Sequence, residues 1–218
     1  FSAASLGIAP ASAPQASAQE AAAQSDSQFA LEFFKDMIEE QPNVEAIGYL
    51  KKTGVVEGYA DKTFLPDFTI NRAEFVKIII AATVEKPKGT NCFNDVKNEW
   101  YARYICEAKA RGIVQGYAGN DFRPGQNINL VEAAKIIVKG LDLEESATVK
   151  NDIWYKKYVK ALETEKAIPV SIDNPDQKIT RGEMSEITWR IKQEIETKPT
   201  KTFEALLSQL PEAGSCPE

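Results

Sequence analysis

The side chains that most often catalyse reactions or bind transition metals are scarce in this chain of 218 residues. It has no histidine, which is the commonest general base and zinc ligand, and it has only three cysteines. A pair of carboxylates could hydrolyse a glycosidic bond, but the glutamates that recur in this chain have a spacing typical of helix caps. A carboxylate-based hydrolase would have to use these residues, so we expect no catalytic site, no metal site and no cofactor.

Three segments have the pattern of a helix N-terminus. An asparagine or threonine is followed three residues later by glutamate, so each side chain can accept a hydrogen bond from the other residue's amide. The predicted cap residues are Asn71, Glu74, Asn129, Glu132, Thr180 and Glu183. The runs after the first two caps are apolar on all sides, which predicts that those helices lie at the centre of the fold.

Two of the cysteines could be bonded to each other. Cys92 and Cys106 lie 14 residues apart, the first before a predicted helix and the second within it. In an exported protein a disulfide would tie the lead-in loop to this helix, and a loop of this size predicts a stabilisation of about 3 kcal/mol. Two buried free thiols are the alternative. Cys216 has no evident partner.

The caps belong to a repeated unit. From Gly54 the chain reads GVVEGYADKTFLPDFTINRAEFVKII, and from Gly112 it reads GIVQGYAGNDFRPGQNINLVEAAKII, at a constant offset of 58 residues (112 − 54). A third, degraded copy has Ala167-Ile168 in place of the Gly-Ile pair and lacks the Gly-Tyr and Phe-x-Pro marks in its loop. Each copy reads as a helix, a compact loop and a second helix.

Helical spacing of apolar residues predicts the first helix of each copy at about residues 44–53, 101–111 and 155–165. A short apolar segment, residues 203–210, lies between prolines near the end of the chain. It predicts one more helix, which could dock on the repeats or join a further domain.

Composition limits the partners and the cell compartment. The net charge of −6 disfavours nucleic acid, and no apolar stretch reaches the ~18 residues needed to span a bilayer. Residues 1–28 are rich in Ala, Ser, Gln and Pro, which predicts disorder. Within them Ala16-Ser17-Ala18 fits a secretory cleavage site, and a plain linker is the alternative.

The combined motifs resemble the S-layer homology repeat. The Asp-Val, Gly-Ile-Val-x-Gly-Tyr, Phe-x-Pro and Thr-Arg-Ala-Glu marks of that repeat are best preserved in the first two copies, and the resemblance covers about residues 29–195. It implies an all-α fold in which three helix-loop-helix repeats form a pseudo-threefold spindle around a central helical bundle. The expected parts are a disordered segment 1–28, repeats at 29–86, 87–143 and 144–195, and a tail or linker at 196–218.

The resemblance also implies a function. Such repeats occur in secreted, non-catalytic proteins of the bacterial cell wall and S-layer, and their grooves bind secondary cell-wall polysaccharide, often through a pyruvylated sugar. A fused or associated surface domain beyond the C-terminus would fit this role. A structural or assembly module that binds no glycan is the alternative.

The arginine of the Thr-Arg-Ala-Glu mark contacts the acidic sugar in this family, and it corresponds to Arg72 and Arg181. Free amides at the helix N-terminus and a bidentate guanidinium would both suit an anion. The second repeat has Leu130 instead, so we expect its groove to bind weakly or not at all. The other ligand-binding candidates are Asp36, Asp95, Asp152, Gly58, Gly116, Trp100 and Trp154. Alternatively, the aspartates cap the first helices and the tryptophans pack in the core.

Overall fold

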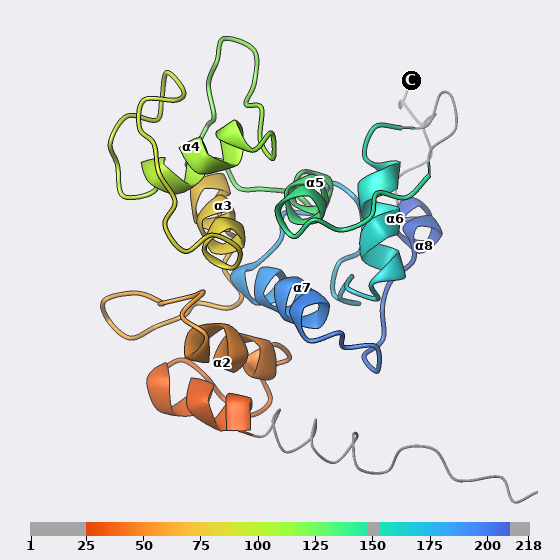
Figure 1. Ribbon diagram of the computed structural model, residues 1–218. Helices are drawn as coiled ribbons and strands as arrows, with labels where there is room; N and C mark the ends of the chain where they lie inside the picture. The colour runs from red at the N-terminus through yellow and green to blue at the C-terminus, as the bar shows by residue number, and fades with distance from the viewer. Residues whose placement is uncertain (1–24, 148–152, 210–218) are drawn as a thin grey trace, which may run out of the picture.

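The computed structural model describes residues 25–147 and 153–209, which form helices joined by loops (Figure 1). The described part of the chain has isolated β-bridges but no strand, so the fold is all-α as predicted. After a helical segment over residues 25–33, the helices are α2 (Val44–Lys52), α3 (Arg72–Ala81), α4 (Ala102–Ala110), α5 (Leu130–Gly140), α6 (Lys156–Thr164), α7 (Arg181–Lys192) and α8 (Phe203–Leu207). Within these residues no helix is both long and apolar enough to cross a membrane.

The second helices of the three repeats, α3, α5 and α7, lie at the centre of the molecule, and the first helices lie outside them (Figure 1). The main contacts pair α4 with α3, α6 with α5 and α2 with α7. Each outer helix therefore packs against the central helix of another repeat. For example, α4 of the second repeat packs on α3 of the first. This exchange decides which side chains meet at the surface.

The residues just before the three central helices hold the repeats together. The amide of Ile70 donates to the carbonyl of Ile179, Ile179 to Ile128, and Ile128 back to Ile70, at 3.1, 3.2 and 3.2 Å. All three side chains are fully buried. This closed ring uses the same position of each repeat, so the degraded third copy is a full member of the fold. A pseudo-threefold spindle for the whole chain remains an expectation of the resemblance.

The central helices begin at the predicted caps. The side chains of Asn71, Asn129 and Thr180 accept from the amides three residues later at 2.9, 3.0 and 3.1 Å. Glu132 and Glu183 complete the capping boxes of α5 and α7. In α3 only the asparagine half of the box is formed, because the two Glu74 oxygens face Tyr59 and Arg181 separately. One oxygen of Glu132 meets both Tyr117 and Arg72, which leaves the other for the cap amide.

The structure changes two details of the predicted organisation. Residues 25–28 belong to the first helical segment and not to the segment expected to be disordered, and Asp26 is mostly buried beside Lys52, 3.2 Å away. In the third repeat, Lys166 and not Ala167 takes the left-handed position, with φ 51° where Gly54 has φ 75°. Gly54, Gly112 and Lys166 each lie two residues after the end of their outer helix. The third copy is therefore aligned with the others by the end of its helix and not by the Gly-Ile motif. The Ala16-Ser17-Ala18 motif, Asp152 and Cys216 lie outside the described residues.

The structure answers two questions that the sequence left open: whether Cys92 and Cys106 are bonded to each other, and whether the segment after the repeats docks on them. Cys92 and Cys106 form a disulfide that ties the loop before α4 to that helix. The segment after α7 docks on the third repeat: the Lys201 amide donates to Ile168 at 3.0 Å, and Phe203 of α8 is buried against α6. The tail therefore closes the third repeat over the part that is described.

Candidate binding site

Two grooves open on the surface, and equivalent residues line them. Groove A, with a volume of about 380 Å³, includes Gly58, Tyr59, Glu74, Lys77, Trp100 and Arg181. Groove B, with a volume of about 190 Å³, includes Gly116, Tyr117, Glu132, Lys135, Trp154 and Arg72. The arginines, tryptophans and glycines were predicted from the sequence as binding candidates, but the tyrosines and lysines were not. The sequence does contain a signal for them, because Tyr59 and Tyr117, and likewise Lys77 and Lys135, are separated by the repeat offset of 58 residues.

Each groove takes side chains from all three repeats. In groove A the first repeat supplies the loop with Tyr59 and the α3 residues, the second repeat supplies Trp100, and the third supplies Arg181. Groove B is shifted by one repeat, so its arginine, Arg72, comes from the first repeat and Trp154 from the third. The packing of each outer helix on another repeat's central helix produces this arrangement.

The arginine of groove A is held rigidly. Arg181 Nε donates to the carbonyl of Phe64 at 2.7 Å, and its guanidinium lies 4.7 Å from the ring centroids of both Tyr59 and Phe64. One Nη lies 3.7 Å from the Glu74 carboxylate. The arginine is only 6% exposed, so few of its rotamers remain accessible before a ligand binds.

Arg72 has the same surroundings in groove B. Its Nε donates to the Phe122 carbonyl at 3.1 Å, its guanidinium lies 4.8 Å from the rings of Tyr117 and Phe122, and Nη1 lies 3.5 Å from Glu132. For both arginines, Nη2 has no hydrogen-bond partner among the described residues. Every fully buried side-chain nitrogen in these residues does have a partner, so Nη2 is not fully buried. This nitrogen therefore reaches the groove surface, where it can donate to a ligand.

The helix N-termini do not offer the free amides that we expected. The first two amides of α7, those of Arg181 and Gly182, donate to the carbonyls of Phe68 and Pro66 at 2.9 and 2.8 Å, and the third donates to the cap residue. The amides at the start of α3 are bonded in the same way to a loop of the second repeat. An anion in either groove therefore cannot bind to these helix amides, and the helix start offers it the arginine side chain instead.

A lysine provides a second cation in each groove. Lys77 Nζ donates to the Val55 carbonyl at 3.2 Å, and Lys135 Nζ lies 5.9 Å from the ring centroid of Trp154. Burial lowers the pKa of both amines, because each loses part of its hydration. A bound anion would compensate for this cost by neutralising the ammonium group.

The tyrosines link each groove loop to its central helix. Tyr59 OH lies 3.3 Å from the Glu74 carboxylate, and Tyr117 OH lies 2.6 Å from Glu132. Burial raises the pKa of both phenols, and the neighbouring carboxylates raise it further. Both tyrosines therefore stay protonated at neutral pH and present a hydroxyl to the groove.

Comparison with known proteins supports the resemblance in two stretches of the chain. Residues 33–76 and 93–134 match the S-layer homology domain, and these stretches supply most of both grooves. The chain contains S-layer homology domains. The third repeat lies outside both matches, although its Arg181 completes groove A.

The relatives of these S-layer homology domains are surface proteins. The chain is 30% identical over 171 residues to the surface-layer 125 kDa protein of Lysinibacillus sphaericus, which covers 71% of this chain and 14% of that protein. It is 31% identical over 115 residues to the cellulosome-anchoring protein of Acetivibrio thermocellus, covering 50% of this chain and 26% of that protein. The middle cell wall protein of Brevibacillus brevis is 29% identical over 141 residues, or 62% of this chain and 13% of that protein. The chain thus spans about a quarter or less of the length of these relatives. Its S-layer homology domains and these relatives place it at the bacterial cell surface.

The tryptophans of the S-layer homology repeats are not core residues. Trp100 and Trp154 are 60% and 54% exposed, and each packs edge-on against the tyrosine that follows it. The interpretation as core plugs is therefore wrong, because the following tyrosine fills the inner position. Each tryptophan leaves its ring accessible beside the arginine of its groove.

The aspartates of the Asp-Val marks organise the groove loops. The Asp36 carboxylate accepts from the amides of Phe64 and Leu65, and Asp95 accepts from Phe122 and Arg123, at 2.7–3.1 Å. These aspartates neither cap the outer helices nor line the grooves. They hold the backbone next to the carbonyl that receives each arginine, so they act on the grooves indirectly.

Substitution of the loop glycines should damage the groove walls. A Cβ at Gly58 would lie 2.4 Å from Phe34 Cε1 and 2.8 Å from the Thr63 carbonyl, and φ is 75°. We expect Gly58→Ala to lower the free energy of unfolding by about 2–4 kcal/mol in urea titrations, from steric overlap in addition to strain. Gly54→Ala is the matched control, because Gly54 has the same φ with nothing within 4 Å, and strain alone should cost about 1 kcal/mol. Equal losses for the two variants would contradict the close approach.

A third groove would lie at the loop of the third repeat, but different side chains occupy the corresponding positions. Leu130 stands for the arginine, Ser171 for the tyrosine, Glu186 for the lysine and Pro42 for the tryptophan. The Leu130 amide donates to Gln177 of this loop, so the missing arginine belongs here and not to the groove of the second repeat. The expectation that the second repeat's groove lacks its arginine is therefore wrong, because Arg72 supplies it.

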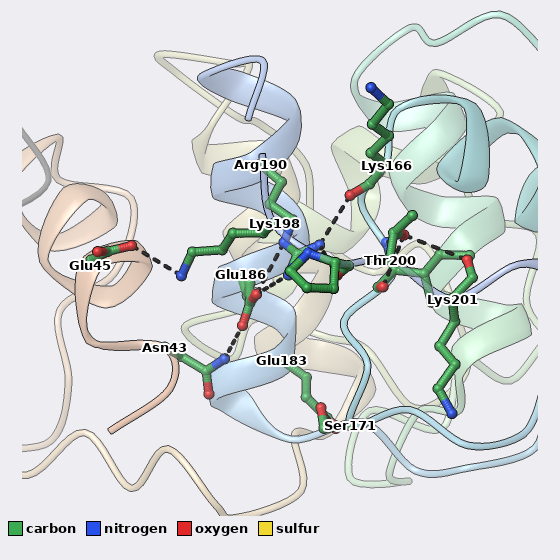
Figure 2. A network of polar contacts seen from close by, with 12 residues as sticks. Asn43, Glu45, Lys166, Ser171, Glu183, Glu186, Arg190, Lys198, Thr200 and Lys201 are labelled. Carbon is green, nitrogen blue, oxygen red and sulfur yellow. Dashed lines mark hydrogen bonds and ion pairs between the residues drawn. The ribbon is translucent and has the colours of Figure 1, made fainter. Parts of the chain in front are cut away.

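A buried polar network fills the position of the third groove (Figure 2). The Glu186 carboxylate accepts from Asn43 of the first repeat and from Arg190 of α7. Arg190 Nη1 also donates to the carbonyls of Lys166 and Pro199 at 3.1 and 2.9 Å. We call Asn43, Glu186, Arg190 and the Pro199 carbonyl the clasp, because they connect the first repeat, α7 and the tail.

Proposed function

We propose that this chain attaches itself, or a protein joined to it, to the bacterial cell wall by binding an acidic wall polysaccharide in grooves A and B. The observation that carries the proposal is the repetition of one site: a buried, rigidly held arginine beside an exposed tryptophan, a lysine and a tyrosine. Two equivalent sites suit a polymer with repeating sugars, because two weak contacts to one chain add avidity.

The chemistry of each groove matches a sugar that bears a carboxylate. The guanidinium Nη2 and the lysine ammonium can bind the carboxylate, for example that of a pyruvyl group. The exposed faces of Trp100 and Trp154 suit the apolar face of a sugar ring, and the tyrosine and glutamate can bind hydroxyls. Binding therefore needs no metal or cofactor, and we assign the module no catalytic step.

The relatives fit a portable attachment unit. The matched region makes up 26% of a protein named for cellulosome anchoring and 10% of exoglucanase XynX, both from Acetivibrio thermocellus. A segment shared by proteins with such different names is better explained by attachment than by either protein's own activity.

An assembly module that binds no glycan is the alternative, and the relatives named as surface-layer proteins favour it. Two features of the sequence also favour it: Leu130 in place of an arginine and the degraded loop of the third repeat. Both changes fall at the position of the third groove, while grooves A and B keep their arginines, and this supports the glycan.

Co-sedimentation with purified sacculi tests the proposal. We expect the chain to pellet with sacculi that retain their secondary polysaccharide and to remain in the supernatant after that polysaccharide is removed. Binding to neither preparation, together with self-association that depends on protein concentration, would favour the assembly module.

A further inference from the structure

Grooves A and B differ in charge although their geometry is equivalent. Glu57 lines groove A at the position where Gln115 lines groove B. Groove A is therefore lined by two cations and two carboxylates, whereas groove B is lined by two cations and one carboxylate. Because both side chains are exposed on the groove wall, the difference faces any ligand directly.

A third cation stands beside groove B. The guanidinium of Arg123 lies 4.2 Å from the ring centroid of Tyr117, which also packs against Arg72. The corresponding position in the first repeat is Leu65, which brings no charge to groove A. Both substitutions make groove B the more positive of the two.

The two groove lysines respond to this difference. Burial lowers the pKa of both. The largest charge effect on Lys77 comes from the Glu57 carboxylate, which raises its pKa, while Arg181, Arg103 and Lys51 lower it. On Lys135 the largest charge effect comes from another cation, Lys139, which lowers its pKa further, and the carboxylate of Glu145 opposes it with a smaller effect. The largest charge effect on Lys77 therefore comes from a carboxylate that lines its own groove, whereas the largest on Lys135 comes from another cation.

We propose that groove B selects acidic sugars, that groove A accepts acidic and uncharged sugars with little preference, and that Glu57 and Gln115 set this difference. The inference rests on the proposed function, since it assigns a ligand class to each of the same two grooves. One protein molecule could then bind an acidic sugar in groove B and an uncharged sugar in groove A, both from a wall polymer in which only some sugars are charged.

The tryptophans make each groove separately measurable. Trp100 reports on groove A and Trp154 on groove B, while the third tryptophan, Trp189, is buried and lies in neither groove. Trp154→Phe leaves groove A intact with its own fluorophore, and Trp100→Phe does the same for groove B. The probes are a pyruvylated hexosamine methyl glycoside and its methyl ester, which is uncharged.

We expect groove B to bind the acid about tenfold more tightly than the ester at low ionic strength, and groove A about twofold. Glu57→Gln in the groove A reporter should raise its preference toward that of groove B, and Gln115→Glu should lower the preference of groove B. Both preferences should shrink in 0.5 M salt, since the charges are partly exposed.

The outcomes separate the inference from the function on which it rests. Equal preferences in the two grooves, or preferences that ignore Glu57→Gln and Gln115→Glu, would overturn the inference and leave the proposed function standing. A chain that binds neither probe and does not pellet with sacculi would overturn both.

Discussion

Replacing Arg72 and Arg181 together by alanine is expected to abolish sedimentation of the chain with polysaccharide-bearing sacculi. Each arginine is the cation held in its groove by a carbonyl, two aromatic rings and a glutamate. Loss of a partly desolvated guanidinium donor to the ligand costs about 2–4 kcal/mol, which is roughly 100-fold in affinity for each groove. Single variants should keep one working groove and lose the avidity of the pair.

Loss of folding must be separated from loss of binding, because both arginines are buried. Arg190→Ala is the matched control: Arg190 is also a buried arginine paired with a glutamate, but it lies in the clasp and lines neither groove. Arg190→Ala should destabilise the chain and still bind sacculi. Full retention of binding by the Arg72→Ala/Arg181→Ala chain, with native circular dichroism, would contradict the assignment of the grooves.

Arg190→Ala is expected to lower the free energy of unfolding by about 3–5 kcal/mol, because it leaves the Glu186 charge buried without its cation. It also removes the donor to two carbonyls, those of Lys166 and Pro199. Urea unfolding followed by circular dichroism measures this change, and the buried position of the pair makes the effect large.

Two further variants make the clasp prediction specific. Lys198→Ala breaks the Lys198–Glu45 ion pair, which is about 30% exposed, so it should cost under about 1 kcal/mol. A chain with Glu186→Leu and Arg190→Met should be less destabilised than Arg190→Ala alone, since no buried charge is left unpaired. A loss below about 1 kcal/mol for Arg190→Ala would mean that the clasp does not hold the first repeat to the last.

Local patterns predicted much of the fold. The cap pattern located the starts of α3, α5 and α7, and helical spacing located α2, α4 and α6 to within about a residue at each end. Caps and amphipathic spacing depend on residues within one or two turns, so a single sequence is enough to find them. The same holds for Gly58, whose left-handed conformation belongs to its own loop.

Contacts between repeats could not be predicted in this way. Asp36 acts on amides 28 and 29 residues later, and the tail reaches Ile168 from 32 residues away. No local pattern distinguishes an aspartate that caps a helix from one that binds a distant loop. The exposure of Trp100 likewise depends on Tyr101 filling the inner position, which only packing determines.

The sequence by itself determined the repeats, their helices, their caps and the two arginines, because each of these depends on side chains close together in the chain. Only the tertiary structure decided which loop meets which arginine: Arg181 joins the first repeat's loop, Arg72 joins the second, and Leu130 faces the third. The physical reason is that each outer helix buries its apolar face on the central helix of another repeat. The two losses visible in the sequence, the missing arginine and the degraded loop, therefore fall together at the position of the third groove, and grooves A and B remain complete.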